Sequence, residues 1–159
     1  MNVIKYNQEA VTCGKVNYPL LLITIRGGIT FYKIDSIDSP PRKVIASIFG
    51  EFGVIGFINI LISQKKLHQN QSISSLLKQA LAKGNNYNVD LTVGDIYGDG
   101  IQQVAGLHKN IIASSMGKSA HQLEDPDILD YIKSLLVMFA INVGNLGALA
   151  VRFDVTNRH

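Results

Sequence analysis

Three glycine-bearing turns are the parts of this sequence best suited to binding a ligand. They lie at Gly27-Gly28-Ile29-Thr30, at Gly50 to Gly56 and at Gly94 to Gly100. Because glycine has no Cβ, the backbone can approach a ligand closely, and several N–H groups can converge on a phosphate. The pattern therefore permits phosphate binding. Glycine also forms ordinary turns in every fold, so each turn taken singly is more often structural.

Metal and hydrolytic chemistry find less support. Asp95 and Asp99 could hold magnesium or accept a proton, but Asp in a glycine-rich loop most often caps its own turn, and we favour that interpretation. The 4 histidines and the single Cys13 share no metal-ligand spacing, so we predict no metal site. The sequence contains neither a G-x-S-x-G elbow nor a G-x-x-x-x-G-K-[ST] loop, which disfavours hydrolase and P-loop chemistry.

The composition predicts one compact domain. The chain has 159 residues, of which 47% are hydrophobic and 17% are charged, so it needs a buried core. The net charge of +3 is mild, and the basic residues form isolated pairs without aromatic neighbours, so we expect no nucleic-acid partner. A single cysteine and no apolar run at the start of the chain predict a cytoplasmic location.

The first half of the chain predicts a small antiparallel sheet. An apolar run from Tyr18 to Ile25 and a β-branched and aromatic run from Ile29 to Ile34 flank Gly27-Gly28, as in a β-hairpin. Gly-Gly is favoured at such a tight turn, because both positions can take positive φ angles without a Cβ penalty. Arg42 to Phe49 restores the strand pattern, which gives three adjacent antiparallel strands.

Helices should follow the strands. Phe52 to Ile62 is apolar almost all round, which predicts a buried helix. Ser72 to Ser75 offers N-cap hydroxyls for a second helix, and Gly84 stands where a C-cap glycine belongs. Asn85 to Val93 is then expected to be a linker.

A long helix is predicted from Pro126 to about Phe153. All residues from Leu135 to Val151 are uncharged, so the run approaches the length needed to cross a membrane. Asn142 and Asn145 interrupt the run, and it has no aromatic belt, so we favour a buried core or dimer helix and expect no membrane partner. Gly144 and Gly147 leave room for a second helix, from another copy or from the same chain.

The segment from Val89 to Lys118 reads V-D-L-T-V-G-D-I-Y-G-D-G and, ten residues later, I-I-A-S-S-M-G-K. This segment resembles the eukaryotic-type (type II) pantothenate kinases, which carry V-G-D-I-Y-G-G and A-S-S-F-G-K runs in this order. Three further blocks share the resemblance: Tyr18 to Thr30, Arg42 to Gly56, and Asn142 to Leu146.

The resemblance implies the fold and the activity. The implied fold is an α/β, actin/hexokinase-like (ribonuclease H-like) lobe with antiparallel hairpin strands followed by helices and a long C-terminal dimer helix. The implied enzyme phosphorylates pantothenate to 4'-phosphopantothenate in coenzyme A biosynthesis, with ATP and magnesium as cofactors, and works as a dimer. On this basis residues 1–17 form an N-terminal segment, 18–154 a partial pantothenate-kinase-like domain, and 155–159 a tail.

The resemblance also implies roles for individual residues. No catalytic residue is assigned, because the family's catalytic acid is expected outside this chain. Lys43 takes the place of the family's substrate-contacting Arg. The implied residues are Gly27, Gly28, Thr30 and Gly50 for nucleotide phosphates, Lys43 and Thr30 for substrate, and Asn142, Gly144, Asn145 and Gly147 for the dimer helix.

Several positions depart from the family pattern. Arg26 and Gly27 replace a glycine and a hydroxyl in the first turn, Ile48 replaces another hydroxyl, and Glu51 and Phe52 replace two glycines of the second turn. We therefore expect weak or no activity from this chain alone. The main alternative is a non-catalytic dimerisation or regulatory module that forms a homodimer or pairs with a full-length homologue. A small membrane-anchored protein is the third.

Overall fold

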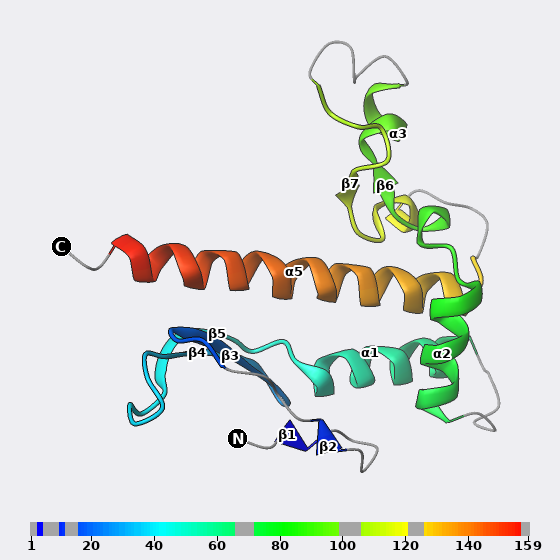
Figure 1. Cartoon of the computed structure of the whole chain (residues 1–159). Coiled ribbons are helices and arrows are strands. Elements are labelled where there is room, and N and C mark those ends of the chain that lie inside the picture. Colours follow the sequence, from blue (N-terminus) through cyan, green and yellow to red (C-terminus); the bar gives the residue numbers. More distant parts are fainter. Residues whose placement is uncertain are drawn as a thin grey trace.

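The computed structural model describes residues 3–4, 10–11, 16–65, 72–98, 106–120 and 126–156 of the chain. A sheet and two helices lie on one side of a long helix, and a small arm projects from its other side (Figure 1). The elements are, in order, β1 (Val3–Ile4), β2 (Ala10–Val11), β3 (Leu20–Ile25), β4 (Ile29–Ile34), β5 (Arg42–Ser47), α1 (Glu51–Gln64), α2 (Ile73–Lys83), η1 (Asn86–Asn88), β6 (Leu91–Thr92), α3 (Val93–Tyr97), β7 (Ile112–Ser114), η2 (Gly117–Ala120) and α5 (Ile128–Thr156).

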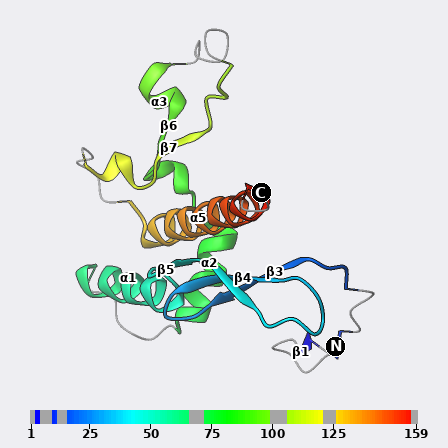
Figure 2. The same cartoon turned by 90° about the vertical axis from the view of Figure 1, so that its left-hand side faces the viewer.

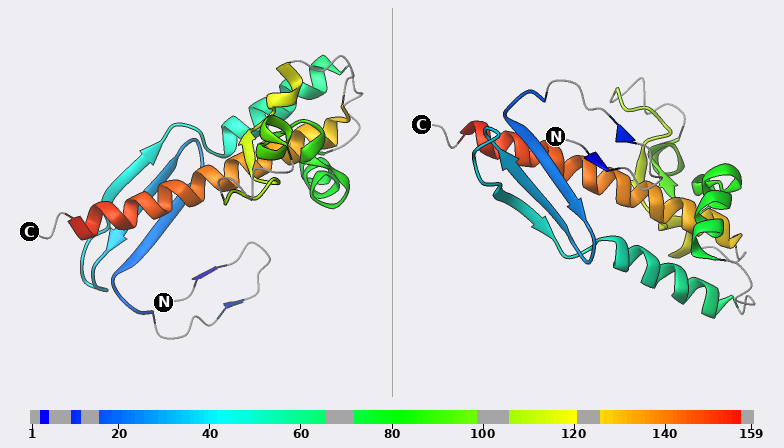
Figure 3. Two further views of the ribbon diagram at one scale, coloured as in Figure 1. Left: turned by 90° about the horizontal axis from the view of Figure 1, so that it is seen from above. Right: turned by 60° about the horizontal axis from the view of Figure 1, so that its bottom comes forward.

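The predicted antiparallel sheet is confirmed. β3, β4 and β5 form a 3-stranded sheet in the order β3-β4-β5, and the long helix crosses one of its faces (Figure 3). In the central strand β4, Ile29, Phe31 and Lys33 are buried while the residues between them are not. Ile29 and Phe31 pack with Ala150 of α5, so these alternate residues point toward the helix.

The Gly27-Gly28 turn forms as predicted, but the predicted reason for its glycines is wrong. Among the described residues, the glycines with positive φ are Gly98 and Gly106 only. Gly28 is required instead by close packing, because a Cβ there would lie 2.5 Å from the Ser47 carbonyl oxygen. The backbone of the hairpin turn therefore lies directly against the end of β5.

Helix α1 is buried on one face only, which corrects the prediction of an all-round buried helix. Val54, Ile58 and Ile62 are buried, whereas Phe52 is 67% exposed and Ile60 is 57% exposed. The three buried residues recur every four positions and so share one face of the helix. They form a core with α2 and the first half of α5.

Helix α2 begins and ends where the sequence predicts. The Ser72 hydroxyl accepts a hydrogen bond from the backbone N–H of Ser75, and Gly84 is the C-cap. Gly84 has φ −65°, so it does not use the left-handed conformation of many C-cap glycines. Its lack of a side chain serves packing, because a Cβ would lie 2.4 Å from the Leu129 carbonyl oxygen of α5.

The long C-terminal helix α5 is confirmed, but most of it is not buried. It packs on α1, α2, β4 and β5 on the side of the sheet, and on η1 on the side of the arm. Residues 128–152 are long and apolar enough to cross a membrane, by length and composition alone, and 17% of the most apolar window is buried. Such a helix is weak evidence of a membrane span. The expectation of a buried core helix therefore holds only where α5 contacts the sheet, the other helices and the base of the arm.

The predicted linker at residues 85–93 is wrong, because this segment is ordered and partly buried. It contains η1 and β6, and Val89 and Asp90 are both 0% exposed. Together with α3, β7 and η2 it forms the arm that stands on the opposite side of α5 from the sheet, as two perpendicular views agree (Figures 1 and 2). Because most residues of this segment are polar, its sequence does not show that the segment is buried where the arm joins α5.

Candidate functional site

The two halves of the Val89 to Lys118 segment come together in the arm. β6 and β7 pair antiparallel, with Leu91 opposite Ser114 and Thr92 opposite Ile112. The N–H of Lys118 also donates to the Val89 carbonyl oxygen at 2.9 Å. The described residues of the two runs therefore form one folded unit, in which the runs pair across a short β-ladder.

Asp90 is the centre of this unit. Its side chain is fully buried and accepts three hydrogen bonds, from Asn86 Nδ2 at 2.7 Å, from the Met116 N–H at 2.8 Å and from the Ser134 hydroxyl. Asn86 belongs to η1, Met116 follows β7, and Ser134 lies in α5. One carboxylate thus joins both halves of the signature to the long helix, as a fully bonded buried polar group does.

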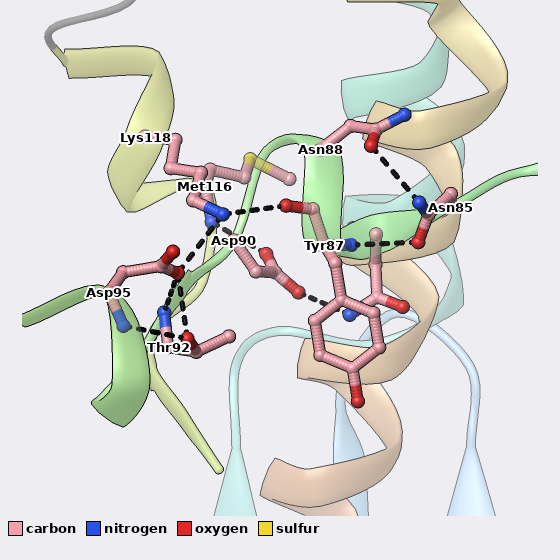
Figure 4. Close-up of polar contacts among 9 residues, drawn as sticks. Asn85, Tyr87, Asn88, Asp90, Thr92, Asp95, Met116 and Lys118 are labelled. Carbon is pink, nitrogen blue, oxygen red and sulfur yellow. Dashed lines mark hydrogen bonds and ion pairs between the residues drawn. The ribbon is translucent and has the colours of Figure 1, made fainter. Parts of the chain in front are cut away.

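Asp95 and Thr92 cap helix α3, which confirms the turn-capping interpretation of Asp95. The Thr92 hydroxyl accepts from the Asp95 N–H at 3.1 Å, and the Asp95 carboxylate accepts from the Thr92 N–H at 2.8 Å, a capping box (Figure 4). The Lys118 ammonium lies 3.0 Å from the same carboxylate and donates to the Tyr87 carbonyl oxygen at 2.9 Å. The lysine of the second motif is therefore held by the aspartate of the first.

These contacts act on the ionisation of Asp95. Hydrogen bonds from the side chain and backbone of Thr92, together with Lys118, lower the pKa of Asp95 from 3.8 to about 2. Such a carboxylate stabilises the fold in its charged form. This contribution is present above the unfolded pKa and is lost as the pH falls through the folded pKa.

We expect Asp95→Asn to lower the free energy of unfolding at pH 7 by about 1 kcal/mol, because the hydrogen bonds from Thr92 and Lys118 lose their charged acceptor while the Thr92 cap remains. The Asp95 side chain is 32% exposed, so solvent screening limits the ion-pair part. The difference from the parent should shrink between about pH 4 and pH 2, where the parent loses the charged carboxylate. Urea unfolding at several pH values measures both effects. A difference that stays constant down to pH 2 would contradict the assignment, and exposed Asp38→Asn is the control.

The other predicted site lies at the beginning of α1, where the structure brings two glycine turns together. A Cβ at Gly50 would lie 2.4 Å from the Arg26 carbonyl oxygen and 2.7 Å from that of Gly28. Gly50 is also the N-cap of α1, and no side chain caps the helix. The Gly27-Gly28 hairpin and the Gly50 turn are thus one compact feature at the positive end of a helix of 14 residues.

The surroundings of these turns combine charge and exposed apolar surface. Arg26 is exposed, and so is Glu51 in the first turn of α1. Ile48 is 99% exposed and Phe52 is 67% exposed. The helix end and Arg26 favour an anion here, whereas the Glu51 carboxylate opposes one. The two charges therefore act in opposite directions on an anion at these turns, and apolar surface lies beside them.

Lys43 and Thr30 share one face of the sheet. In the antiparallel register Thr30 is opposite Ala46, and Lys43 is opposite Tyr32, the next residue of β4 on the same face. This face points away from α5, because the alternate residues Ile29 and Phe31 point toward it. The two predicted substrate residues are therefore neighbours on the exposed face, and Thr30 is two residues from Gly28.

The predicted dimer-helix residues divide into two groups. Asn142, Gly144 and Asn145 are exposed on α5, and a Cβ at Gly144 would meet nothing within 4 Å. Gly147 instead faces its own chain, because a Cβ there would lie 3.5 Å from the Phe31 ring. The close approach at Gly147 is thus to the sheet of the same chain, while the other three residues are open to a partner.

The structure does not bring the two candidate sites together. The arm with Asp90, Asp95 and Lys118 stands on one side of α5, and the glycine turns lie with the sheet on the other (Figure 1). Asp99 lies outside the described residues. Within the described ranges, no group of three or more His, Cys, Asp or Glu side chains could hold a metal ion.

Sequence reasoning missed the two residues that tie the arm to the rest of the fold. The linker predicted at residues 85–93 includes Asp90, and nothing in the sequence pattern distinguishes Ser134. A signal was present, since Asp90 lies within the V-D-L-T run of the motif, and a charged residue between Val89 and Leu91 must either be exposed or be fully bonded. Its partners lie up to 44 positions away, so the sequence did not reveal them.

Comparisons with known proteins agree with the motifs. A family model described as Fumble matches residues 2–158. The chain is 33% identical over 142 residues to a protein of Arabidopsis thaliana named pantothenate kinase 1, covering 87% of this chain and 35% of the relative. It is 30% identical over 146 residues to a pantothenate kinase of Schizosaccharomyces pombe, covering 89% of this chain and 34% of the relative.

A mouse protein named 4'-phosphopantetheine phosphatase is also similar, with 33% identity over 141 residues, 89% of this chain and 16% of the relative. The chain therefore spans about a third or less of the length of these relatives.

Proposed function

This chain belongs to the Fumble family, and we propose from this premise that it supplies part of a pantothenate kinase, an enzyme that uses ATP to phosphorylate pantothenate to 4'-phosphopantothenate in coenzyme A biosynthesis. The carrying observation is the folded Val89–Lys118 unit, in which the V-G-D-I-Y-G and S-S-M-G-K runs meet through Asp95 and Lys118. Two relatives with about 30% identity are named pantothenate kinase.

In this proposal the turns at the start of α1 contact the nucleotide. The backbone of Gly27, Gly28 and Gly50 faces the phosphates of ATP, with the α1 N-terminus and Arg26 as the positive charges. Gly27 is the most open of the three, because a Cβ there would approach only the Phe52 ring, at 3.8 Å. Bound ATP supplies the phosphoryl group, and magnesium arrives with it, since the described residues offer no acidic cluster to hold the metal.

Thr30 and Lys43 are the proposed substrate residues. Their shared sheet face begins at the Gly28 turn, so a substrate lying on it can reach a phosphate held at the turn. The Lys43 ammonium is suited to pair with the pantothenate carboxylate. It does so as a single point charge, whereas the planar guanidinium of an Arg could donate two parallel hydrogen bonds. The proposed fold is the actin/hexokinase-like lobe, in which phosphoryl transfer also needs groups from a second lobe. We therefore propose weak or no turnover by this chain alone.

Isothermal calorimetry with magnesium-ATP, with and without pantothenate, tests this proposal, followed by a coupled turnover assay on the same sample. ATP binding without turnover is the expected result. Turnover would show that this chain alone is sufficient for phosphoryl transfer. If neither ATP binding nor turnover is detected, the non-catalytic function described below is supported instead.

We expect Glu51→Gln to strengthen ATP binding by about threefold or more, because it removes a carboxylate near the bound phosphates. Asp38→Asn changes the net charge equally, but it lies in the turn beyond Ile34, at the other end of β4 from Gly28. Calorimetry at two salt concentrations compares the variants, and the effect should weaken at higher salt. If Glu51→Gln and Asp38→Asn bind ATP with equal affinity, the turn at Gly50 does not contact the phosphates.

A non-catalytic dimerisation or regulatory module is the second candidate function. Two observations favour it: the charged and bulky residues Arg26, Glu51 and Phe52 at the glycine turns, and the exposed Asn142, Gly144 and Asn145 on α5. The similar mouse protein is named for a phosphatase activity, so this region also occurs in a protein that is not named a kinase. Sedimentation velocity, which reports a dimer or a complex with a full-length homologue, distinguishes this function.

A further inference from the structure

The turn between β4 and β5 carries a serine that is followed by two prolines. Residues 36–43 read S-I-D-S-P-P-R-K, so Ser39 directly precedes Pro40, and Arg42 stands at the third position after it. Of the 4 prolines in the sequence, only Pro40 follows a serine or a threonine. A hydroxyl in this context therefore occurs at a single position of the chain.

This spacing suits one class of Ser/Thr protein kinase. Proline has no backbone N–H, so a kinase cleft without an acceptor at this position takes proline and rejects residues whose N–H would lose its hydrogen bond to water. A guanidinium at the third position after the serine can pair with an anionic group of the kinase. Together the two features define the S-P-x-R motif of proline-directed kinases of the cyclin-dependent class, which Ser39 to Arg42 matches.

The structure presents this motif to solvent. The turn projects from the end of the sheet opposite to α1, where it is drawn in cyan (Figure 1). Residues 35–38 and 40–43 are exposed on both sides of Ser39, which is itself partly exposed. Pro40 and Pro41 lie outside β4 and β5, so a kinase can bind them without separating the two strands.

The Ser39 hydroxyl is held only by short-range bonds of the turn. It donates to the Ser36 carbonyl oxygen at 2.9 Å and accepts from the Ser36 N–H at 2.8 Å, and both bonds are exposed. The Ser39 N–H donates to the same carbonyl oxygen at 3.3 Å, which closes a four-residue turn. Because these three bonds join residues at the surface, water can replace them, and the turn can open while β4 and β5 stay paired.

The charges around the turn favour a phosphate on Ser39. Arg42 at the start of β5 lies opposite Lys33 of β4 in the strand register. The Lys33 ammonium is 2.6 Å from the Asp35 carboxylate and neutralises this acid. Basic residues outnumber acidic ones between residues 33 and 43, so the added phosphate enters a region of net positive charge.

We propose that Ser39 is a phosphorylation site for a proline-directed Ser/Thr protein kinase of the cyclin-dependent class. Its Oγ attacks the γ-phosphorus of the ATP that the kinase holds, the Oγ–P bond forms, and the bond from this phosphorus to the bridging oxygen of ADP breaks. The hydroxyl proton passes to the catalytic aspartate of the kinase, and ADP leaves. Gly28 precedes β4 and Ser39 follows it, so the site lies at the opposite end of this strand from the glycine turns.

The first test incubates the complete chain with a purified cyclin-dependent kinase, its cyclin and magnesium-ATP, and locates the product by tandem mass spectrometry. We expect one phosphate, on Ser39. Ser39→Ala should abolish the product, whereas Ser36→Ala should retain it, because Ser36 binds Ser39 through its backbone. No incorporation, or a phosphate on another residue while Ser39 stays unmodified, would overturn the proposal.

Substitutions around Ser39 test the recognition. Pro40→Ala should lower kcat/KM for the kinase by about 100-fold or more, and Arg42→Ala by about tenfold. Ile37→Ala is the matched control, because Ile37 is 71% exposed in the same turn, and it should change kcat/KM by less than about threefold. Equal rates for Pro40→Ala and the parent would assign the turn to no proline-directed kinase.

A synthetic peptide of residues 33–45 separates recognition from folding. We expect the same ratios among its variants, and a kcat/KM for the folded chain within about 100-fold of the peptide's, since only the surface bonds of the turn have to open. If the peptide is phosphorylated and the folded chain is not, the turn stays closed in the fold and the proposed site is wrong.

Discussion

Asp90→Ala is expected to lower the free energy of unfolding by about 3 kcal/mol or more, the largest effect of any single substitution proposed for this chain. The carboxylate is fully buried and accepts from Asn86, the Met116 N–H and Ser134. Its removal leaves three donors without a partner in a site closed to water, and each unpaired buried group costs about 1–3 kcal/mol. The arm would then lose its attachment to α5.

Urea denaturation measures this effect, and hydrogen exchange of the arm shows where it acts. Ser134→Ala removes one of the three donors while leaving the carboxylate, so it should cost about 1 kcal/mol. Asp38→Ala, in an exposed turn, should cost less than about 0.5 kcal/mol. If Asp90→Ala were no more harmful than Asp38→Ala, the carboxylate would not hold the arm. Uniform loss of protection across the sheet as well as the arm would show a wider role.

Two glycines only six positions apart should respond to alanine with opposite signs. Gly50→Ala is expected to destabilise the fold by about 2–3 kcal/mol, because its Cβ would lie 2.4 Å from one carbonyl oxygen and 2.7 Å from another. Both neighbours are backbone atoms of the hairpin turn, which cannot rotate away as a side chain can. The turn that is proposed to face the nucleotide would have to separate from α1.

Gly56→Ala is the matched comparison. Gly56 lies inside α1, and a Cβ there would meet nothing within 4 Å. Since alanine is the better helix former by about 1 kcal/mol, this variant should be as stable as the parent or more stable. Thermal unfolding of both variants checks the pair. Loss of stability in Gly56→Ala, or none in Gly50→Ala, would show that the close contact at the start of α1 is misplaced.

Much of the local structure could be predicted because it depends on neighbours in sequence. The hairpin at Gly27-Gly28 follows from two β-rich runs separated by a turn, and α2 follows from the Ser72 cap and its periodic apolar residues. The role of Asp95 was predictable for the same reason, since its capping partner Thr92 is three residues away. The signature that carries the family membership is likewise a local run of residues.

Other predictions failed where the deciding contacts come from distant residues. The segment 85–93 reads as a polar linker, yet Asp90 is buried because Met116 and Ser134 supply hydrogen bonds that its own segment cannot. Gly28 reads as a residue chosen for positive φ, yet the carbonyl of Ser47 on the next strand decides that only glycine fits.

The sequence was enough to predict the hairpin sheet of β3, β4 and β5, the helices α1, α2 and α5, the caps of α2 and the family signature, because these depend on φ, ψ and side-chain preferences within a few residues. Tertiary packing, in contrast, sets which polar groups are buried and places the glycine turns and the arm on opposite sides of α5. Burial is a property of the whole packing arrangement, so a residue's own neighbours in sequence cannot fix it.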